Sequence, residues 1–552
     1  MNLPEPLNKQ FSSLIDDISC GRLKIPQFQR DFVWDIKKSA GLLDSIVKGY
    51  PVGTFIFWKT KDRLRSVKDI GNLNLPDPVS GDYVNFVLDG QQRITSLFAA
   101  FKGEKITRGD GKIEDFSEIY IDLDANEDEK IVTSEKDDNK SNHLIKLNDL
   151  LYGGLTSLAG YPMVYHEKLE EYKKRIESYN YSVIQVNEVP IDVATEIFTR
   201  INVGGKPLTL FEIMVAKTYD YEQDFDLSEK FDSLIEKLES VNYETIADAT
   251  ILQIISLILT KECKRKIILK LKKEDFINIW ADVINATESA VEYFKSFYRI
   301  PVSQLLPYNA LLVPFTYFFY YHKDKPTGDK QKYLQDFFWR VSLAGRYSSS
   351  VESKLAQDIK RIDKILKNEL PDYDWPINFS TEFIKNNGWF SAGRSYIKAI
   401  LCIYAWHQPK SFIDGSLVNI SNDWLKQANS KNYHHFFPRA YLAKLNKDEK
   451  MINHIINITI VDDFLNKREI RDKAPAKYMK TFKEKNLRLT DVMKTHLIDD
   501  IDDFGIWDNN YELFFEKRTR AVSKEIKKRI IPQKIDEKPQ ADLVDDAVEI
   551  VE

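Results

Sequence analysis

The sequence predicts a multidomain α+β protein, with an α/β domain first, a helical region in the middle and a small ββα domain towards the C-terminus. β-favouring runs alternate with helical spacing up to about residue 225, helical spacing dominates after that, and a segment with paired histidines follows residue 381. A chain of 552 residues is also too long for one ordinary core. We expect domains at 1–225, 226–380 and 381–531, followed by a disordered acidic tail at 532–552.

The composition limits the classes of partner. The formal net charge is −5, so nucleic-acid binding must use local basic patches and not the charge of the whole molecule. The cysteines Cys20, Cys263 and Cys402 lie far apart, which excludes a zinc ribbon, argues against a disulfide framework and fits a reducing cytosol. No signal pattern opens the sequence and no window has the length of a membrane span. We therefore expect a cytoplasmic protein with no membrane partner.

The first domain begins with a helix predicted at about 7–19. Pro26 disfavours a helix, so the segment around it is expected to be extended and to present Gln29 and Arg30. Asp35 is placed to cap the next helix. The strands of the domain are expected at 54–58, 83–88, 117–123 and 181–189. Residues 124–142 are charged and lack apolar periodicity, which indicates a mobile insertion.

The turn from strand to helix at 89–93 is the first candidate site. A β-favouring apolar run stops at Asp89 and Gly90, and helical spacing begins at once after them. Gly90 allows close approach of backbone to a ligand, and the first helical N–H groups are free to face an anion. Asp89 is suited to a divalent cation and Arg93 to a phosphate. A capped helix start with a surface arginine explains the same residues equally well.

A second polar turn ends the helix that starts near 191. Arg200 and Asn202 precede Gly204 and Gly205, which suits a phosphate, although Gly-Gly is also an ordinary helix stop. From about 209 to 370 helical spacing dominates. The dense aromatic residues of that region are expected to face a helical core, with a base-stacking platform as the alternative.

A ββα metal site is predicted around His434 and His435. The two histidines lie on one predicted strand, Asn457 begins a second β-branched run, and Asn466 follows on an expected helix. Such an arrangement can hold Mg²⁺ or a similar ion between His434 and Asn466 and leave positions open for a scissile phosphate. His435 faces the other way and can act as general base, with Asn457 orienting its imidazole. The structural alternative is two partly exposed histidines beside an aromatic cluster, and a zinc site is disfavoured because no cysteine lies nearby.

The sequence around the second half of this site is basic. Between 464 and 488 there are nine Lys or Arg against three Asp or Glu, which supports DNA binding, although solvated helix faces produce such runs too. The residues that we expect to contact DNA are Lys467, Arg468, Arg471, Lys473 and Lys477.

With these segments placed, the chain resembles the GmrSD-type modification-dependent (type IV) restriction endonucleases and their phage-defence relatives. Four motifs resemble a ParB-like nucleotide-binding domain: Ile25-Pro-x-Phe-Gln-Arg30, Leu43-x-Ser-Ile46 with Gly49-x-Pro51-x-Gly53, Asp89-Gly-Gln-Gln-Arg93 and Phe198-x-Arg-Ile-Asn202-x-Gly-Gly205. His434-His-Phe-Phe-Pro438, with Asn457 and Asn466, resembles a His-Asn-His (HNH) nuclease domain. The helical middle matches only loosely.

The resemblance implies an NTP-regulated, metal-dependent DNA endonuclease or nickase that restricts modified phage DNA. Its cofactors would be Mg²⁺ or another divalent cation and a nucleoside triphosphate (GTP, UTP or ATP). Its partner would be double-stranded DNA, and a homodimer is allowed. By motif position, the nucleotide site comprises Asp89, Gly90, Gln91, Gln92 and Arg93, with Arg30, Arg200 and Asn202 as helpers.

In the nuclease half, the resemblance makes His435 the base and His434 and Asn466 the metal ligands. The first ligand position is often acidic in such nucleases. The neutral His434 therefore lowers the charge of the site and could alter its metal preference.

A second hypothesis comes from a different class of protein. The chain could be a ParB-like, nucleotide-dependent DNA-binding or regulatory protein whose nuclease motif is vestigial. The joint presence of both histidines and both asparagines counts against decay of the site. Metal-dependent nicking of a plasmid separates the two hypotheses.

Overall fold

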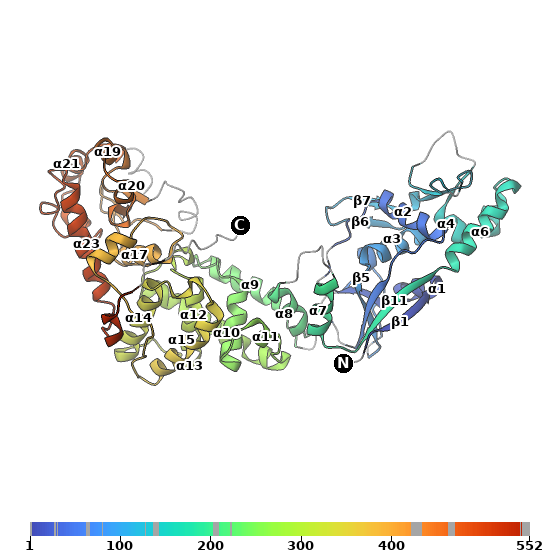
Figure 1. Cartoon of the computed structure of the whole chain (residues 1–552), viewed down its shortest axis with the longest axis horizontal. Helices are drawn as coiled ribbons and strands as arrows, with labels where there is room; N and C mark the ends of the chain where they lie inside the picture. The colour runs from blue at the N-terminus through green and yellow to red at the C-terminus, as the bar shows by residue number, and fades with distance from the viewer. Residues whose placement is uncertain are drawn as a thin grey trace. The chain divides into compact units, whose positions relative to one another are not determined.

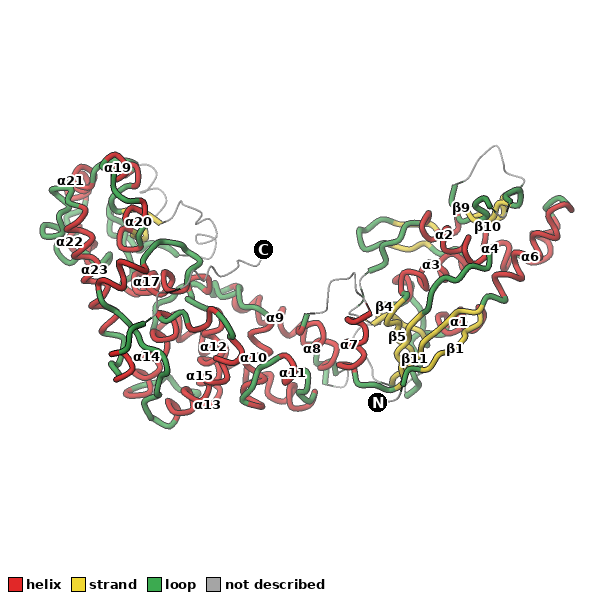
Figure 2. Tube along the Cα trace, in the orientation of Figure 1, coloured by secondary structure: helices red, strands yellow, loops and turns green. Residues whose placement is uncertain are grey.

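The computed structural model divides the chain into two compact units, Met1–Leu227 and Ser228–Glu552, called here the N-terminal and the C-terminal unit. The structure describes residues 3–26, 29, 31–61, 64, 67–79, 81–126, 128–135, 143–201, 209–220, 223–420, 433–461, 470–540 and 543. The N-terminal unit holds the large sheet, whereas the C-terminal unit is mainly helical (Figures 1 and 2). The chain is thus a mixed α/β protein. No helix among the described residues is long and apolar enough to cross a membrane.

A mixed six-stranded sheet organises the N-terminal unit. Two of its pairs, β11 with β3 and β2 with β5, are parallel, and the other three are antiparallel. In spatial order the strands are β1 (Glu5–Gln10), β11 (Asn180–Asn187), β3 (Phe55–Thr60), β5 (Val84–Asp89), β2 (Leu23–Pro26) and β4 (Val67–Lys68). The predicted strands at 54–58, 83–88 and 181–189 are confirmed as β3, β5 and β11.

The first strand corrects the prediction of a helix at 7–19. β1 pairs antiparallel with β11 from Glu5↔Gln185 to Gln10↔Asn180, and α1 (Phe11–Ser19) begins only after it. Pairing at the sheet edge satisfies the backbone groups of this segment, and tertiary contacts of this kind override local helical spacing. Leu7 is 43% exposed and does not extend the apolar stripe of α1.

Helices cover both faces of the sheet. On one face the apolar core joins the strands to α1, α2 (Ile36–Val47), α3 (Gln91–Lys102) and α6 (His166–Glu177), with Leu43, Phe57 and Leu97 fully buried. On the other face α7 (Ile191–Ile201) contacts β5, and the Trp58 ring lies 5.5 Å from the Phe86 ring. β5 is therefore covered on both faces, and its last residue begins the 89–93 turn.

The expected insertion at 124–142 is partly ordered. Residues 132–133 form β9 (Val132–Thr133), which joins β8 (Tyr120–Asp122) and β10 (Leu144–Lys146) in a small sheet. Ile131 and Val132 are buried, and their N–H groups donate to Asp44 Oδ1 at 2.7 and 3.0 Å. These two apolar residues anchor the segment on α2 despite its charged surroundings. Residues 136–142 lie outside the described part.

The described part of the N-terminal unit contains five further α-helices and β-strands. They are β6 (Lys105–Thr107), β7 (Ile113–Asp115), α4 (Leu147–Tyr152), α5 (Gly154–Ala159) and α8 (Leu210–Thr218).

Aromatic side chains form the core of the helical part of the C-terminal unit. The Phe294 and Phe315 rings lie 4.7 Å apart, and those of Tyr298 and Phe338 lie 4.2 Å apart. All four residues are buried, which confirms that this aromatic-rich region faces a core. The helices are α9 (Leu227–Glu239), α10 (Asp248–Thr260), α11 (Arg265–Ile268), α12 (Lys273–Ser296), α13 (Leu312–Tyr321), α14 (Gly328–Leu343) and α15 (Val351–Leu366).

A short hairpin surrounded by helices forms the second half of the C-terminal unit. Its elements are α16 (Thr381–Asn387), α17 (Ser395–Trp406), β12 (Tyr433–His435), α19 (Arg439–Lys444), α20 (Glu449–Ile452), β13 (Ile458–Ile460), α21 (Pro475–Lys485), α22 (Leu489–Lys494) and α23 (Tyr511–Lys527). Arg518 on α23 is fully buried and donates to the carbonyls of Ile456 and Ile458. This side chain fixes β13 against α23.

The segment after α23 returns to the helical half of the unit. Arg340, which is fully buried, donates to both carboxylate oxygens of Asp336 and to Asp536 Oδ1 and Oδ2 at 2.8 and 2.7 Å. Gln540 Oε1 accepts the N–H of Asn378. The prediction that disorder begins at 532 is therefore wrong, because charge pairing holds residues 531–540 in place. Of the residues after 540, only 543 is described.

Candidate functional site

The 89–93 turn depends on glycine. Gly90 has φ +94° and precedes the first residue of α3, and a Cβ there would lie 2.3 Å from Phe55 Cδ1. Only glycine fits both the left-handed backbone and this close contact. Within the described residues, no side chain caps the first turn of α3. The strand, the turn and the helix are thus as predicted from the sequence, and Gly103 ends the helix as expected.

The guanidinium of Arg93 is bound within the protein. It donates to the carbonyls of Val52 and Thr54 at 2.7 and 3.0 Å and to Asp89 Oδ2 at 2.9 Å. A Cβ at Gly53 would lie 2.3 Å from Arg93 Nη1, so this approach also depends on a glycine. In this structure Arg93 therefore joins the loop before β3 to the turn after β5.

Two glutamines bring the extended segment after β2 to the same turn. Gln29 is buried, and its Nε2 donates to the carbonyls of Val87 and Leu88 at 2.8 and 2.9 Å. Gln92 accepts the N–H of Val33 and donates to the carbonyl of Asp31. The structure therefore brings together two motifs that lie about 60 residues apart in the sequence. Gln29, expected on the surface, instead fixes the end of β5.

Two further predicted nucleotide-binding residues, Arg200 and Gln91, are described by the structure. Arg200 lies at the end of α7, where its side chain is 77% exposed and pairs with Glu196 at 2.6 Å. Gln91 is buried at the start of α3. Arg30 and Asn202, with Gly204 and Gly205, lie outside the described residues.

The two histidines lie on β12 of the predicted hairpin. β12 pairs antiparallel with β13, in the register Tyr433↔Ile460, His434↔Thr459 and His435↔Ile458. Successive side chains of a strand point to opposite faces, so the two imidazoles face different surroundings. The expected helix with Asn466 lies outside the described residues, as do Lys467 and Arg468.

His434 is buried, and one of its ring nitrogens has no hydrogen-bond partner among the described residues. The Thr459 hydroxyl donates to the His434 carbonyl at 3.2 Å, so its oxygen can only accept from His434 Nδ1, 3.3 Å away. Nδ1 therefore carries the proton and Nε2 carries the lone pair. Nε2 is buried and has no hydrogen-bond partner among the described residues. Burial lowers the pKa of His434 to about 3, with further contributions from His435 and His496, so the ring stays neutral.

His435 is half-buried and bound by a residue that the sequence analysis missed. Its Nε2 lies 3.1 Å from Asn453 Oδ1, and Asn453 Nδ2 donates to the carbonyl of Phe390 at 3.3 Å. Burial lowers the pKa of His435, and the bond to Asn453 partly offsets this effect. No pattern in the sequence identifies Asn453, because it lies in an irregular connection before β13.

Asn457 holds the backbone of the hairpin. Its Oδ1 accepts the N–H of Phe437, and its Nδ2 donates to the carbonyls of Phe437 and Ile452. Its backbone carbonyl accepts the N–H of Phe436. All these bonds go to backbone groups, and the ring of His435 is oriented by Asn453 instead. Asn457 was expected to orient the imidazole of His435, and it bonds to backbone groups of the hairpin instead.

The basic helix α21 packs beside the hairpin. Tyr478 is buried, donates its hydroxyl to the Phe436 carbonyl, and has its ring 6.4 Å from the His434 ring. Lys477 and Lys480 flank it on the exposed side of the helix. Arg471 is exposed and Lys473 half-buried in the turn before α21. Of the five predicted DNA-binding residues, the structure thus describes three, all close in sequence to the helix that supports His434.

No group of three or more His, Cys, Asp or Glu side chains within the described ranges is placed to hold a metal ion. A metal at the hairpin would therefore use His434 Nε2 together with groups of other kinds or from outside those ranges. The orphaned, unprotonated Nε2 fits that role, because neutral imidazole nitrogen is a common metal ligand.

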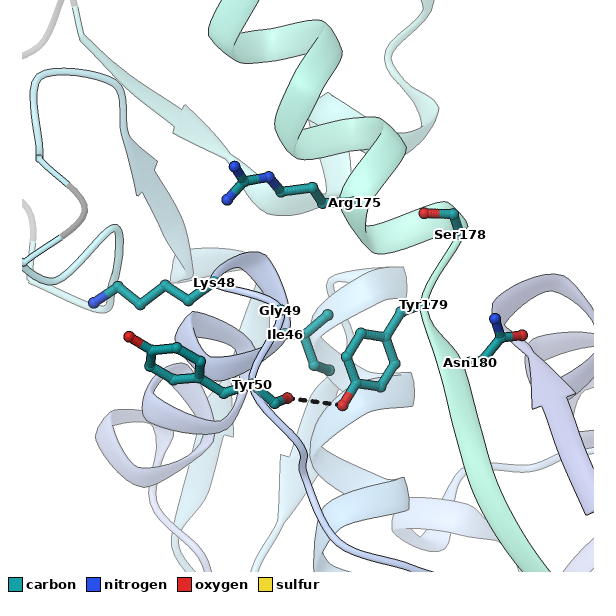
Figure 3. Close-up of a pocket in the computed structure, with 8 residues that line it drawn as sticks. All are labelled: Ile46, Lys48, Gly49, Tyr50, Arg175, Ser178, Tyr179 and Asn180. Atoms are coloured by element: carbon teal, nitrogen blue, oxygen red, sulfur yellow. Dashed lines mark hydrogen bonds between the residues drawn. The ribbon is translucent and has the colours of Figure 1, made fainter.

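A separate pocket of about 470 Å³ lies at the C-terminal ends of α2 and α6 (Figure 3). Its lining residues are Ile46, Lys48, Gly49, Tyr50, Arg175, Ser178, Tyr179 and Asn180. Lys48 Nζ donates to the Glu129 carbonyl at 2.6 Å, and Arg175 Nη1 to the Val47 carbonyl at 3.1 Å. None of the lining residues belongs to the predicted nucleotide site.

Comparison with known proteins concerns mainly the N-terminal unit. Residues 11–219 match the family described as GmrSD restriction endonuclease, N-terminal domain. The match includes the 89–93 turn and Arg200, whereas the histidine hairpin lies beyond it. An uncharacterized protein of Methanocaldococcus jannaschii is 24% identical over 566 aligned positions, which cover 89% of this chain and 92% of the relative. The N-terminal unit is therefore similar to the N-terminal domain of GmrSD restriction endonucleases.

Proposed function

We propose that the chain is an NTP-regulated, metal-dependent DNA endonuclease or nickase that restricts modified foreign DNA. The observation that carries this proposal is the β12–β13 hairpin, where two adjacent histidines differ in environment. Among the described residues, His434 Nε2 is buried without a partner, and His435 is half-buried and hydrogen-bonded on one nitrogen. Buried polar groups are usually satisfied, so an orphaned nitrogen in a hairpin indicates a ligand.

The roles of the hairpin residues follow from this difference. His434 Nε2, with Asn466, would hold a divalent cation such as Mg²⁺, which when bound stabilises charge on the scissile phosphate. His435 accepts a proton from the attacking water. Asn457 keeps the two strands and the following turn in register through its bonds to Phe437 and Ile452.

The adjacent surface suits a polyanion. α21 carries exposed Lys477 and Lys480 and is anchored to β12 through Tyr478. The phosphates of a duplex bound along this helix would therefore lie near His434 and His435. Arg471, Lys473, Lys467 and Arg468 extend the same basic stretch of sequence.

The 89–93 turn would bind the nucleoside triphosphate (GTP, UTP or ATP). The uncapped start of α3 offers N–H groups to a phosphate, and Asp89, with a side chain 33% exposed, can hold a cation. Arg93 and Gln92 already bind backbone from the loops at 52–54 and 31–33. A nucleotide at this turn would thus contact a point where three segments meet, which suits a regulatory role.

The test is cleavage of matched modified and unmodified phage DNA by the full chain, with each nucleotide and divalent cation added in turn. We expect metal-dependent cleavage that His435→Ala abolishes while nucleotide binding persists. Asp89→Ala should remove nucleotide hydrolysis and the nucleotide dependence of cleavage. Nicking by His435→Ala protein at the wild-type rate would refute the site. Nucleotide-dependent DNA binding without cleavage in any metal would favour the ParB-like regulatory alternative.

A further inference from the structure

The amide of Asn453 has a single consistent orientation. Asn453 Nδ2 lies 3.3 Å from the Phe390 carbonyl, and Asn453 Oδ1 lies 3.1 Å from His435 Nε2. Exchanging the two amide atoms would set oxygen against the carbonyl oxygen of Phe390, which is repulsive. The backbone supports the same placement, because Phe390 N–H donates to the Asn453 carbonyl.

This orientation determines the tautomer of His435. Asn453 Oδ1 is an acceptor only, so His435 Nε2 must be the donor and must carry the proton in the neutral ring. The lone pair is then on Nδ1, which has no partner among the residues that the structure describes. The neighbouring His434 has the reverse arrangement, with its proton on Nδ1, because Thr459 accepts from that nitrogen.

We propose that Asn453 is a positioning residue that holds His435 in the Nε2–H tautomer, so that Nδ1 is the nitrogen that accepts a proton. The inference rests on the proposed nuclease function. In the hydrolytic step, the water oxygen bonds to phosphorus, its proton moves to His435 Nδ1, and the bond from phosphorus to the leaving sugar oxygen breaks. The leaving oxygen is protonated by solvent. Asn453 touches neither water nor phosphate and acts through the imidazole alone.

The first test needs no substitution at Asn453. Nitrogen-15 spectra of the full chain with labelled histidine, at neutral pH, distinguish protonated from unprotonated ring nitrogens, and His435→Gln assigns the signals. We expect a protonated Nε2 on His435 and a protonated Nδ1 on His434. A proton on Nδ1 of His435 overturns the proposal, whatever the protein cleaves.

The second test separates positioning from folding. Asn453→Leu removes the acceptor, and we expect kcat for DNA cleavage to fall about tenfold or more, a part of the ~10²–10⁴-fold that general-base catalysis contributes. KM for DNA should stay within about twofold. Asn453→Gln keeps both an acceptor oxygen for His435 and a donor amide for the Phe390 carbonyl, so it should retain the His435 tautomer and more of kcat than Asn453→Leu.

The control for folding is the neighbouring histidine. His434 signals in the Asn453→Leu protein should match the wild type, because Thr459 and not Asn453 sets that ring. Unchanged kcat in Asn453→Leu protein overturns the positioning role. A wild-type chain with the expected tautomer that cleaves no DNA overturns the proposed function and with it the base role of Nδ1. Cleavage with the opposite tautomer overturns the Asn453 assignment alone.

Discussion

The 89–93 turn and the β12–β13 hairpin use polar side chains in opposite ways. In the turn, Arg93 makes three hydrogen bonds inside the protein, and Gln92 makes two. In the hairpin, His434 Nε2 has no partner among the described residues although it is buried. The turn is thus stabilised by its own motif residues, whereas the hairpin keeps an unsatisfied atom. A motif can therefore be needed for folding in one unit and for ligand binding in the other.

The largest effect is expected at the hairpin. His434→Leu removes the lone pair that would bind the cation, so metal-dependent cleavage should fall at least about 100-fold. The free energy of unfolding should change by only about 1 kcal/mol, because an apolar side chain of similar size replaces a ring with an unsatisfied nitrogen. DNA nicking assays and urea unfolding of the full chain measure the two quantities. A large loss of stability would show that His434 supports the fold as Arg93 does.

The matching change in the turn should act mainly on stability. Arg93→Leu leaves the carbonyls of Val52 and Thr54 without their donor and Asp89 without its cation, so we expect a loss of about 2–4 kcal/mol. Urea unfolding of the full chain, followed by amide exchange in α3 and β3, measures it. Arg200→Leu is the control, because Arg200 is exposed and its ion pair within the described residues is with Glu196, four residues earlier on the same helix. Equal stability of both variants would contradict a stabilising role of the Arg93 hydrogen bonds.

A smaller loss is expected from Gly90→Ala. The added Cβ would meet Phe55 Cδ1 at 2.3 Å on a backbone with φ +94°, so the cost should be about 1–3 kcal/mol. Thermal unfolding of the full chain tests it. Gly81→Ala is a control for the backbone alone, since Gly81 has φ +91° and open space around it. If both variants lose the same stability, the contact with Phe55 contributes nothing.

The last prediction concerns the pH dependence of stability. All three buried histidines among the described residues lie in the C-terminal unit, and burial lowers the pKa of His454 to about 4 and of His496 to about 3. In the unfolded chain the histidine pKa is near 6.5. At any pH between that value and the lower pKa of the folded state, the unfolded chain binds more protons than the folded chain. Stability should therefore fall as pH drops below about 6.5, by about 1.4 kcal/mol per pH unit for each histidine.

Amide exchange at Ile456 can follow this loss locally. The Ile456 N–H donates to His454 Nδ1, so protonation of that nitrogen breaks the bond. After correction for the intrinsic rate, exchange at Ile456 should accelerate on acidification before exchange in α3 does. A simultaneous rise in both places would show that acid destabilises the two units alike.

Local patterns predicted much of the fold. The apolar run into β5, the helical spacing of α3 and the caps at Asp35 and Gly103 concern neighbouring residues, and all are present. The paired strands at His434 and directly after Asn457 were predicted in the same way. Each of these elements is specified by residues within a few positions of one another.

The contacts that complete each site could not be predicted in this way. Arg93 binds carbonyls that lie 41 and 39 residues earlier, and Asn453 contacts His435 from a position 18 residues later, beyond α19 and α20. β1 depends on β11, which follows it by about 170 residues, so its local helical spacing misled the prediction. Such partners are selected by tertiary structure, and no periodicity in the sequence identifies them.

The pairing of Arg340 with Asp536 has a consequence for synthesis on the ribosome. All the hairpin residues emerge before Asp536, yet until then the buried guanidinium of Arg340 lacks one of its two carboxylates. A nascent chain stopped between 461 and 536 would carry the complete hairpin, but two buried N–H groups of Arg340 would lack the carboxylate that accepts from them. Premature termination should therefore yield unstable fragments that proteases remove, and not stable shortened chains.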